Sequence, residues 1–157
     1  MTTRLRRLAE ADQIVRATLK LIKYLAPRRW WLENPRFGLL RHRRFMRKFR
    51  YVDLDYCMFS DYGYRKPTRF WMSDEMAERL KDITCKGGCA NMVDGDHGKR
   101  HRLQIGGRTK QRGTREEAYR IPPGVVDYPI KETKEPHEQT GEELAVAIEP
   151  ISNCAKS

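Results

Sequence analysis

The chain has 157 residues, of which 39% are hydrophobic and 34% are charged, and its formal net charge is +11 at pH 7. This length fits one domain with a tail, and the hydrophobic fraction is enough for one small core. There is no run of 18 apolar residues, which excludes a membrane-spanning helix. Because the N-terminus lacks the apolar segment of a secretory signal, we expect an intracellular protein of the cytoplasm or nucleus, or of the nucleoid in a prokaryotic or phage setting.

Positive charge is concentrated near the N-terminus. Residues 1–50 hold 15 basic and 3 acidic side chains, whereas residues 116–157 hold 4 basic and 9 acidic ones. Such a cationic segment favours a polyanionic partner, most simply the phosphates of a nucleic acid. The alternative is a solvated helical face, or an organelle or ribosomal protein.

Four elements are predicted in the first 59 residues. Apolar residues at three- and four-residue steps predict an amphipathic helix over residues 3–25, ended by Pro27. Residues 29–33 indicate a short buried strand, and residues 39–49 a second, strongly basic helix. Alternating apolar and polar residues predict a strand over residues 51–59.

The remaining elements are shorter. We expect a returning strand at residues 68–72, a weak helix capped by Ser73, a short helix capped by Thr114, and a last apolar turn that opens at Pro122–Pro123. The order of helices and strands in the first half points to an α/β layer. We divide the chain into an α/β half-domain (1–84), a basic Cys/His loop with a closing helix (85–130) and a disordered acidic tail (131–157).

Three segments carry a resemblance to a known family. They are "WWLENP" at residues 30–35, "VDLDYCMFSDYGYRKPTRFW" at 52–71 and "REEAYRIPPGVVDYPI" at 115–130. Together they resemble, in order, the DNA (cytosine-5) methyltransferases of phage and mobile-element type. The resemblance implies part of a Rossmann-like, S-adenosylmethionine-dependent methyltransferase fold.

The family's chemistry assigns roles to residues in these segments. These enzymes flip a cytosine out of DNA and add a cysteine thiolate to C6, while a carboxyl group contacts N3 and the exocyclic amine. By resemblance, Glu33 is that carboxyl, and Asn34 and Pro35 fix the turn that presents it. Lys66 and Arg69 are both candidates for the cation beside the base, with Thr68 in support. The alternatives are that Glu33 caps a helix beginning near Pro35, and that Arg69 is a phosphate clamp or a surface residue.

The chain also departs from the family. It has no counterpart of the Gly-rich loop that holds S-adenosylmethionine, and none of its four cysteines follows a proline, as the family's nucleophile does. It therefore resembles the C-terminal half of a methyltransferase that binds DNA and is inactive alone. Methylation would require the missing half and S-adenosylmethionine, and that half is either carried by a second chain or lost to truncation. The alternatives are a non-catalytic nucleic-acid-binding or assembly protein that contains a small zinc site, and a decayed gene fragment.

A second motif has metal-ligand character. Cys85, Cys89, His97 and His101 form a C-x3-C-x7-H-x3-H pattern, and thiolate and imidazole are favoured zinc ligands. The middle spacing is too short for a strand and helix between the two pairs. Zinc would alternatively take both cysteines, one histidine and Cys57, which is otherwise a buried thiol. The remaining interpretation is a flexible basic loop with incidental cysteines.

Basic side chains are the candidates for contacts to phosphate. One group precedes residue 50, and a second lies in residues 85–113, the segment that corresponds to target recognition in the family. The candidates are Arg41, Arg43, Arg44, Arg47, Lys48, Lys99, Arg100, Arg102, Arg108, Lys110 and Arg112. Such residues neutralise phosphates without reading the sequence.

Overall fold

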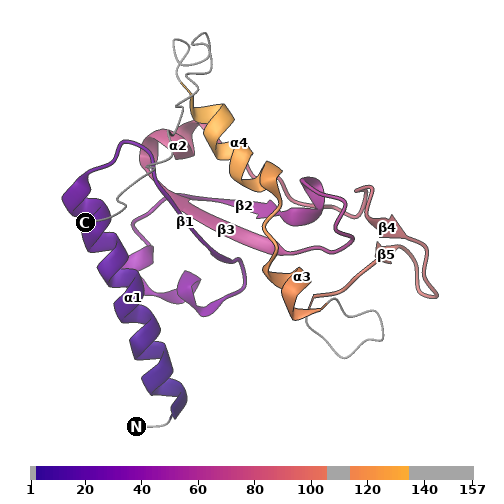
Figure 1. Cartoon of the computed structure of the whole chain (residues 1–157), viewed down its shortest axis with the longest axis horizontal. Coiled ribbons are helices and arrows are strands. Elements are labelled where there is room, and N and C mark those ends of the chain that lie inside the picture. Colours follow the sequence, from indigo (N-terminus) through magenta and orange to yellow (C-terminus); the bar gives the residue numbers. More distant parts are fainter. Residues whose placement is uncertain (1–2, 106–113, 135–157) are drawn as a thin grey trace, which may run out of the picture.

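The computed structural model describes residues 3–105 and 114–134, and its helices and strands are arranged around one small sheet (Figure 1). In chain order the elements are α1 (Thr3–Leu25), β1 (Trp31–Pro35), the 3-10 turns η1 (Leu39–His42) and η2 (Arg44–Met46), β2 (Tyr51–Asp55), the 3-10 turn η3 (Tyr56–Met58), β3 (Pro67–Met72), α2 (Asp74–Arg79), β4 (Met92–Val93), β5 (Arg100–His101), α3 (Arg115–Tyr119) and α4 (Pro123–Thr133). In Figure 1, α1 and the β4–β5 hairpin lie at opposite ends of the molecule.

The main sheet has three strands in the order β1-β3-β2, and both pairings are antiparallel. In one row across the sheet Glu33 pairs with Phe70, which pairs with Val52. The predicted mixture of helices and strands is confirmed. In the described ranges, however, every pairing between named strands is antiparallel, so they contain no parallel β-α-β unit of a Rossmann-like fold.

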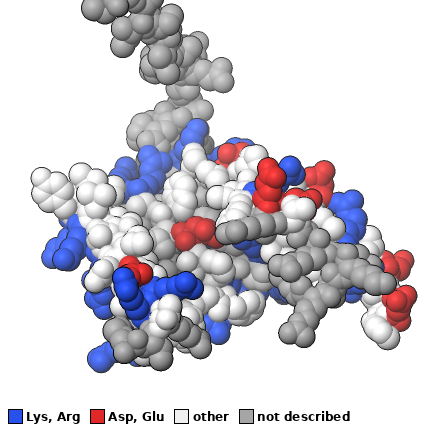
Figure 2. Space-filling model, turned by 60° about the horizontal axis from the view of Figure 1, so that its bottom comes forward, with Lys and Arg blue, Asp and Glu red and all other residues white. Residues whose placement is uncertain are grey.

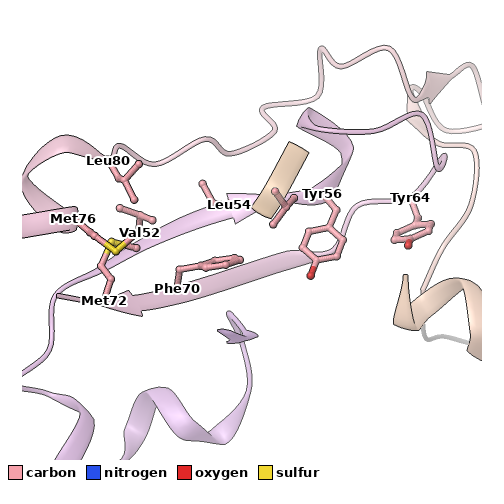
Figure 3. Packing of buried hydrophobic residues seen from close by; sticks show 9 residues of the cluster. Val52, Leu54, Tyr56, Tyr64, Phe70, Met72, Met76 and Leu80 are labelled. Carbon is pink, nitrogen blue, oxygen red and sulfur yellow. The ribbon is translucent and has the colours of Figure 1, made fainter. Parts of the chain in front are cut away.

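Apolar side chains cover both faces of this sheet. On the first face the main core joins strand residues to α2 and to Val125 of α4, and Figure 3 shows eight of its nine members with labels: Val52, Leu54, Tyr56, Tyr64, Phe70, Met72, Met76 and Leu80. On the second face Trp71, Leu40 and Met46 are buried beneath α1, with Val15 and Leu19 packed against them. The sheet is thus the middle of three layers.

The long N-terminal helix was predicted with its observed bounds. It ends before Ala26, whose φ of +44° lies in the left-handed region, and Pro27 cannot continue it. Asp12 accepts a hydrogen bond from Arg43 at 2.9 Å, which fixes α1 to the turns below it. Other apolar side chains of α1 remain exposed, including Ile14 at 69%.

Three predicted elements need correction. The basic helix expected over residues 39–49 is two 3-10 turns separated by Arg43, since Leu40 and Met46 turn inward there while Arg41 and Arg44 remain exposed. The strand expected at residues 29–33 lies at 31–35, so Glu33 is in mid-strand and does not end the strand. The strand after residue 50 ends at Asp55, and Cys57 lies in η3.

The C-terminal half adds a hairpin and two helices. The β4–β5 hairpin pairs Met92 with His101, and Thr114 caps α3 through a reciprocal capping box with Glu117, as expected for a Thr at this position. Residues 131–133, assigned to the acidic tail, belong to α4, and the rest of the predicted tail from residue 135 lies outside the described residues. The domain boundaries at 84 and 130 stay predictions.

Candidate functional site

Glu33 points to the face of the sheet that carries the main core. Its strand partner Phe70 lies on this face, and the Glu33 Oε1 atom is buried without a hydrogen-bond partner. Burial raises the pKa of the Glu33 carboxyl above its usual range, and the positive charge of Lys66 opposes this shift. A buried acceptor with no partner is costly in a folded protein, so its presence marks a candidate binding position.

Lys66 and Tyr56 interact electrostatically with this carboxyl. The Lys66 ammonium nitrogen is 4.7 Å from the centroid of the Tyr56 ring, and the ring is fully buried. Burial raises the pKa of the Tyr56 phenol, and the charge of Glu33 adds to the shift, while the nearby Thr68 hydroxyl opposes it. The Tyr56 hydroxyl is buried without a hydrogen-bond partner, and the Thr68 hydroxyl donates to the Lys66 carbonyl at 3.2 Å. A carboxyl, an ammonium and a phenol thus converge at one end of the core.

Arg69 lies on the opposite face of β3. Its guanidinium donates two hydrogen bonds to Asp53, at 2.7 and 2.8 Å, and its central carbon lies 3.6 Å from the centroid of the Tyr51 ring. The Asp53 hydrogen bonds raise the pKa of Arg69. The sequence left the choice between Lys66 and Arg69 open. In the structure the charge of Lys66 acts on Glu33, whereas Arg69 is paired with a carboxylate on the other face.

The residues after Glu33 shape the end of the strand. Asn34 is a strand residue that pairs with Arg69, and the turn begins only after Pro35, where Gly38 donates to the Pro35 carbonyl at 2.8 Å. A Cβ atom at Gly38 would lie 2.6 Å from Asn34 Oδ1 and 3.0 Å from the Pro35 carbonyl oxygen, so a larger residue here would displace the Asn34 side chain. No helix begins at Pro35, and Glu33 is therefore not a helix cap.

The predicted phosphate-binding cations differ in what they contact. Arg43 is held by Asp12, and Arg102 donates to the backbone carbonyl of Asp61 at 2.6 Å, so both have internal structural roles. Exposed side chains are found at Arg41, Arg44, Arg47, Lys48 and Lys99. On the face seen in Figure 2, Lys and Arg side chains are spread over several parts of the surface, with acidic side chains between them. Arg108, Lys110 and Arg112 lie outside the described residues.

A basic cavity of about 630 Å³ lies against the hairpin. Four cationic side chains line it together with His101 and Cys85, namely Arg65, Lys86, Lys99 and Arg100. One terminal nitrogen of Arg100 is buried there without a hydrogen-bond partner. Such a lining favours an anion.

The hairpin also brings three cysteines and one histidine together. The ligand atoms of Cys57, Cys85, Cys89 and His101 all lie within 4.8 Å of one another. His97, which the spacing placed in the ligand set, is exposed in the turn between β4 and β5 and is not part of this group. Of the sequence alternatives, the geometry fits the set that includes Cys57.

Two buried polar residues were missed by sequence analysis. Asp55, assigned to a polar strand face, is fully buried and accepts hydrogen bonds from Arg65 at 2.9 Å and from the Cys85 backbone at 2.7 Å. Asn91 is 1% exposed and donates to the backbone carbonyls of Cys57 and Ser60. Neither has a local sequence signal, because their partners lie between 10 and 34 residues away along the chain.

Comparison with known proteins gives one informative relative. The protein named "Probable DNA (cytosine-5)-methyltransferase" of Frog virus 3 (isolate Goorha) is 34% identical to this chain over 119 residues, which is 72% of this chain and 53% of the viral protein. The chain thus spans about half the length of this relative. The similarity supports a methyltransferase-like relationship, as the resemblance in the three segments implied. The individual motifs and the interpretation as a C-terminal half stay predictions.

The other comparisons give no match. No protein-family model and no solved structure matches the chain. Among the residues that the structure describes, no helix has both the length and the apolar character needed to cross a membrane.

Proposed function

We propose that this chain is the base-binding portion of a DNA (cytosine-5) methyltransferase-like protein, and that Glu33 and Lys66 hold a cytosine flipped out of DNA. The observation that carries the proposal is the buried, unpartnered Oε1 atom of Glu33. Similarity to the viral protein described as a probable DNA (cytosine-5)-methyltransferase supports the substrate class.

The chemistry of the two side chains matches the edge of cytosine. N3 of cytosine accepts a hydrogen bond and its exocyclic amine donates one, and a protonated carboxyl supplies one donor and one acceptor. Burial raises the pKa of Glu33 and so favours this protonated form. Lys66 has only donors, which suits the carbonyl oxygen at C2. Arg69, bound to Asp53, supports the sheet from the other face in this proposal.

Methyl transfer to C5 needs two further components. The family's reaction needs a thiolate that adds to C6, and no cysteine of the 157 residues follows a proline as the family's nucleophile does. S-adenosylmethionine would supply the methyl group when it is held by a part of the protein outside this chain. Within this chain, the proposed work of Glu33 is to read the base and hold a proton at N3. We expect the chain alone to bind DNA and to transfer no methyl group.

Binding to extruded bases tests the proposal directly. Fluorescence anisotropy would compare two duplexes that carry a single bulged nucleotide, cytosine in one and thymine in the other. We expect the chain to prefer the bulged cytosine by about tenfold, equivalent to about 1.4 kcal/mol. Glu33→Leu, which removes both the donor and the acceptor, should abolish the preference, and the same change at the exposed Glu78 should leave it unchanged. Equal binding of both duplexes by the parent chain would refute the proposal.

Contacts to phosphate are tested by salt dependence. Arg44 and Arg47 are exposed, whereas the nearby Arg50 forms an ion pair with Glu78 at 3.6 Å. We expect Arg44→Ala and Arg47→Ala each to weaken binding to any duplex and to lower the slope of log K against log salt by about 1. Arg50→Ala is the matched control and should lower that slope less. Unchanged slopes in both variants would remove this surface from the interface.

Non-catalytic nucleic-acid binding is the second candidate function, and the missing Pro-Cys dipeptide favours it. It predicts that the chain binds bulged cytosine and bulged thymine equally while it retains salt-dependent affinity for duplex DNA.

A further inference from the structure

Three separate segments bring sulfur and nitrogen ligands to one point. Cys57 comes from η3, Cys85 and Cys89 from the loop after α2, and His101 from β5. The four ligand atoms lie within 4.8 Å of one another, and His101 Nε2 is 3.4 Å from Cys89 Sγ and 3.7 Å from Cys85 Sγ. Zinc–ligand bonds of about 2.0–2.3 Å at tetrahedral angles separate neighbouring ligand atoms by roughly 3.3–3.8 Å. Both distances from His101 fall in that range.

The turn between Cys85 and Cys89 is shaped for chelation. Gly87 has a φ of +90°, which reverses the chain between the two cysteines, and its N–H donates to Cys85 Sγ at 3.4 Å. The backbone N–H of Cys85 is itself held by the buried Asp55 at 2.7 Å. Donors of this kind orient a thiolate and stabilise its charge, as the outer-shell partners of metal ligands do.

Hydrophobic packing contributes little to the stability of the hairpin. Between residues 84 and 105 the fully buried side chains are Cys85 and Asn91, and only Leu103 and Ile105 pack against the main core. A segment that buries so little apolar surface depends on another cross-link, and metal binding supplies such free energy in small domains.

We propose that Cys57, Cys85, Cys89 and His101 bind one Zn²⁺ ion in a closed, tetrahedral site of structural type. Four protein ligands leave no open position for a substrate, and three soft thiolates favour zinc over magnesium or calcium. On binding, the cysteine thiols that are protonated release their protons to solvent, so that three thiolates and a neutral imidazole surround the ion. This site is independent of the base-binding proposal, because Glu33 and Lys66 are not ligands.

Metal analysis of the full chain tests the assignment, with two histidines as a matched pair. We expect mass spectrometry of the purified protein to find one zinc ion per chain in the parent and in His97→Ala. In a chelator competition, His101→Ala and Cys57→Ser should each lower zinc affinity at least about a hundredfold. Loss of an outer-shell partner costs up to about a hundredfold, and these two residues are direct ligands in the proposal. Retention of full affinity in these two variants would overturn the ligand set, and so would an equal loss in His97→Ala.

A second measurement does not depend on the folding of variants. Cobalt replaces zinc in such sites, and its visible spectrum reports both geometry and the number of thiolate ligands. The parent chain should give the spectrum of tetrahedral cobalt with three thiolates. A spectrum with two thiolates would show that one of the three cysteines is not a ligand and would overturn the proposal. Failure to bind either metal, or detection of a disulfide among the three cysteines in the freshly purified protein, would also overturn it.

Discussion

The three-stranded sheet and the β4–β5 hairpin are stabilised by different means. The sheet buries apolar side chains on both faces, including Leu54, Phe70 and Trp71, and each strand pairing has a full register of five residues. The hairpin has two paired positions and is joined to the rest of the protein mainly through polar groups such as Asn91 and Asp55. Hydrophobic burial therefore defines the sheet, whereas the position of the hairpin depends on a few directional contacts.

The largest effect is expected from the sheet core. Phe70→Ala removes a ring that is 2% exposed at the centre of the main core, and such truncations cost about 3–5 kcal/mol of unfolding free energy. Urea denaturation followed by circular dichroism measures the loss. Phe37→Ala is the control, since Phe37 is 64% exposed, and it should change stability by less than about 0.5 kcal/mol. Equal losses in the two variants would contradict the described core.

The hairpin should respond to the loss of one polar residue. Asn91→Ala leaves the N–H of Gly63 and the carbonyls of Cys57 and Ser60 without their partner, at a cost of about 2–3 kcal/mol. We expect hydrogen exchange to accelerate in the hairpin and in residues 57–63, with little change in β3. Asp94→Ala, an exposed change in the same hairpin, should leave exchange unaltered. Uniform acceleration across the sheet would show that the two regions unfold together.

Loss of a helix cap should have a smaller and local effect. Thr114 Oγ1 accepts from the Glu117 N–H at 3.1 Å, and the Glu117 carboxylate accepts from the Thr114 N–H at 2.6 Å. Thr114→Ala should cost about 1 kcal/mol, measured as faster exchange of the Glu117 amide, whereas Thr114→Ser keeps the oxygen and most of the protection. Similar rates in both variants would argue against the capping box.

The smallest expected effect is a change in pH dependence at Glu33. The pKa of Glu33 is higher in the folded state than its usual value of 4.5. The protonated carboxyl therefore contributes fully to stability below pH 4.5, and this contribution is lost as the pH rises through the folded pKa. Glu33→Gln cannot ionise, so its stability relative to the parent should increase as the pH rises from 4.5 through the folded pKa of Glu33. Denaturation at several pH values measures this difference, with Glu78→Gln as the control. A difference that is flat or falls with pH would contradict the raised pKa.

The sequence predicted the elements that have a strong periodicity or a local cap. Residues 3–25 and the capping at Thr114 belong to this group, because their signals lie within one or two helical turns. The basic segment at 39–49 was misassigned, since its apolar residues fit a helical period as well as two tight turns. The pairing of the strands was not predictable from local pattern, and it decides that Glu33 shares a face with Phe70 rather than with Arg69.

The candidate metal cluster was predicted only in part for the same reason. Spacing identifies cysteines and histidines that are close in sequence, so it selected His97 together with His101. Cys57 lies 28 residues before Cys85 in the sequence. It joins the cluster only because the fold brings η3, which follows β2, to the loop that contains Cys85 and Cys89. The antiparallel β4–β5 pairing leaves His97 in the exposed turn between the two strands.

The strand order has one more consequence, which concerns motion. β3 is hydrogen-bonded on both sides, whereas in the described structure β1 is paired only with β3. Lys66 directly precedes the central strand, and Glu33 lies in the middle of an edge strand, where backbone fluctuations are larger. The backbone that carries Glu33 is therefore expected to move more than the backbone that leads into β3 after Lys66, so that adjustment to a bound base would begin at the edge strand.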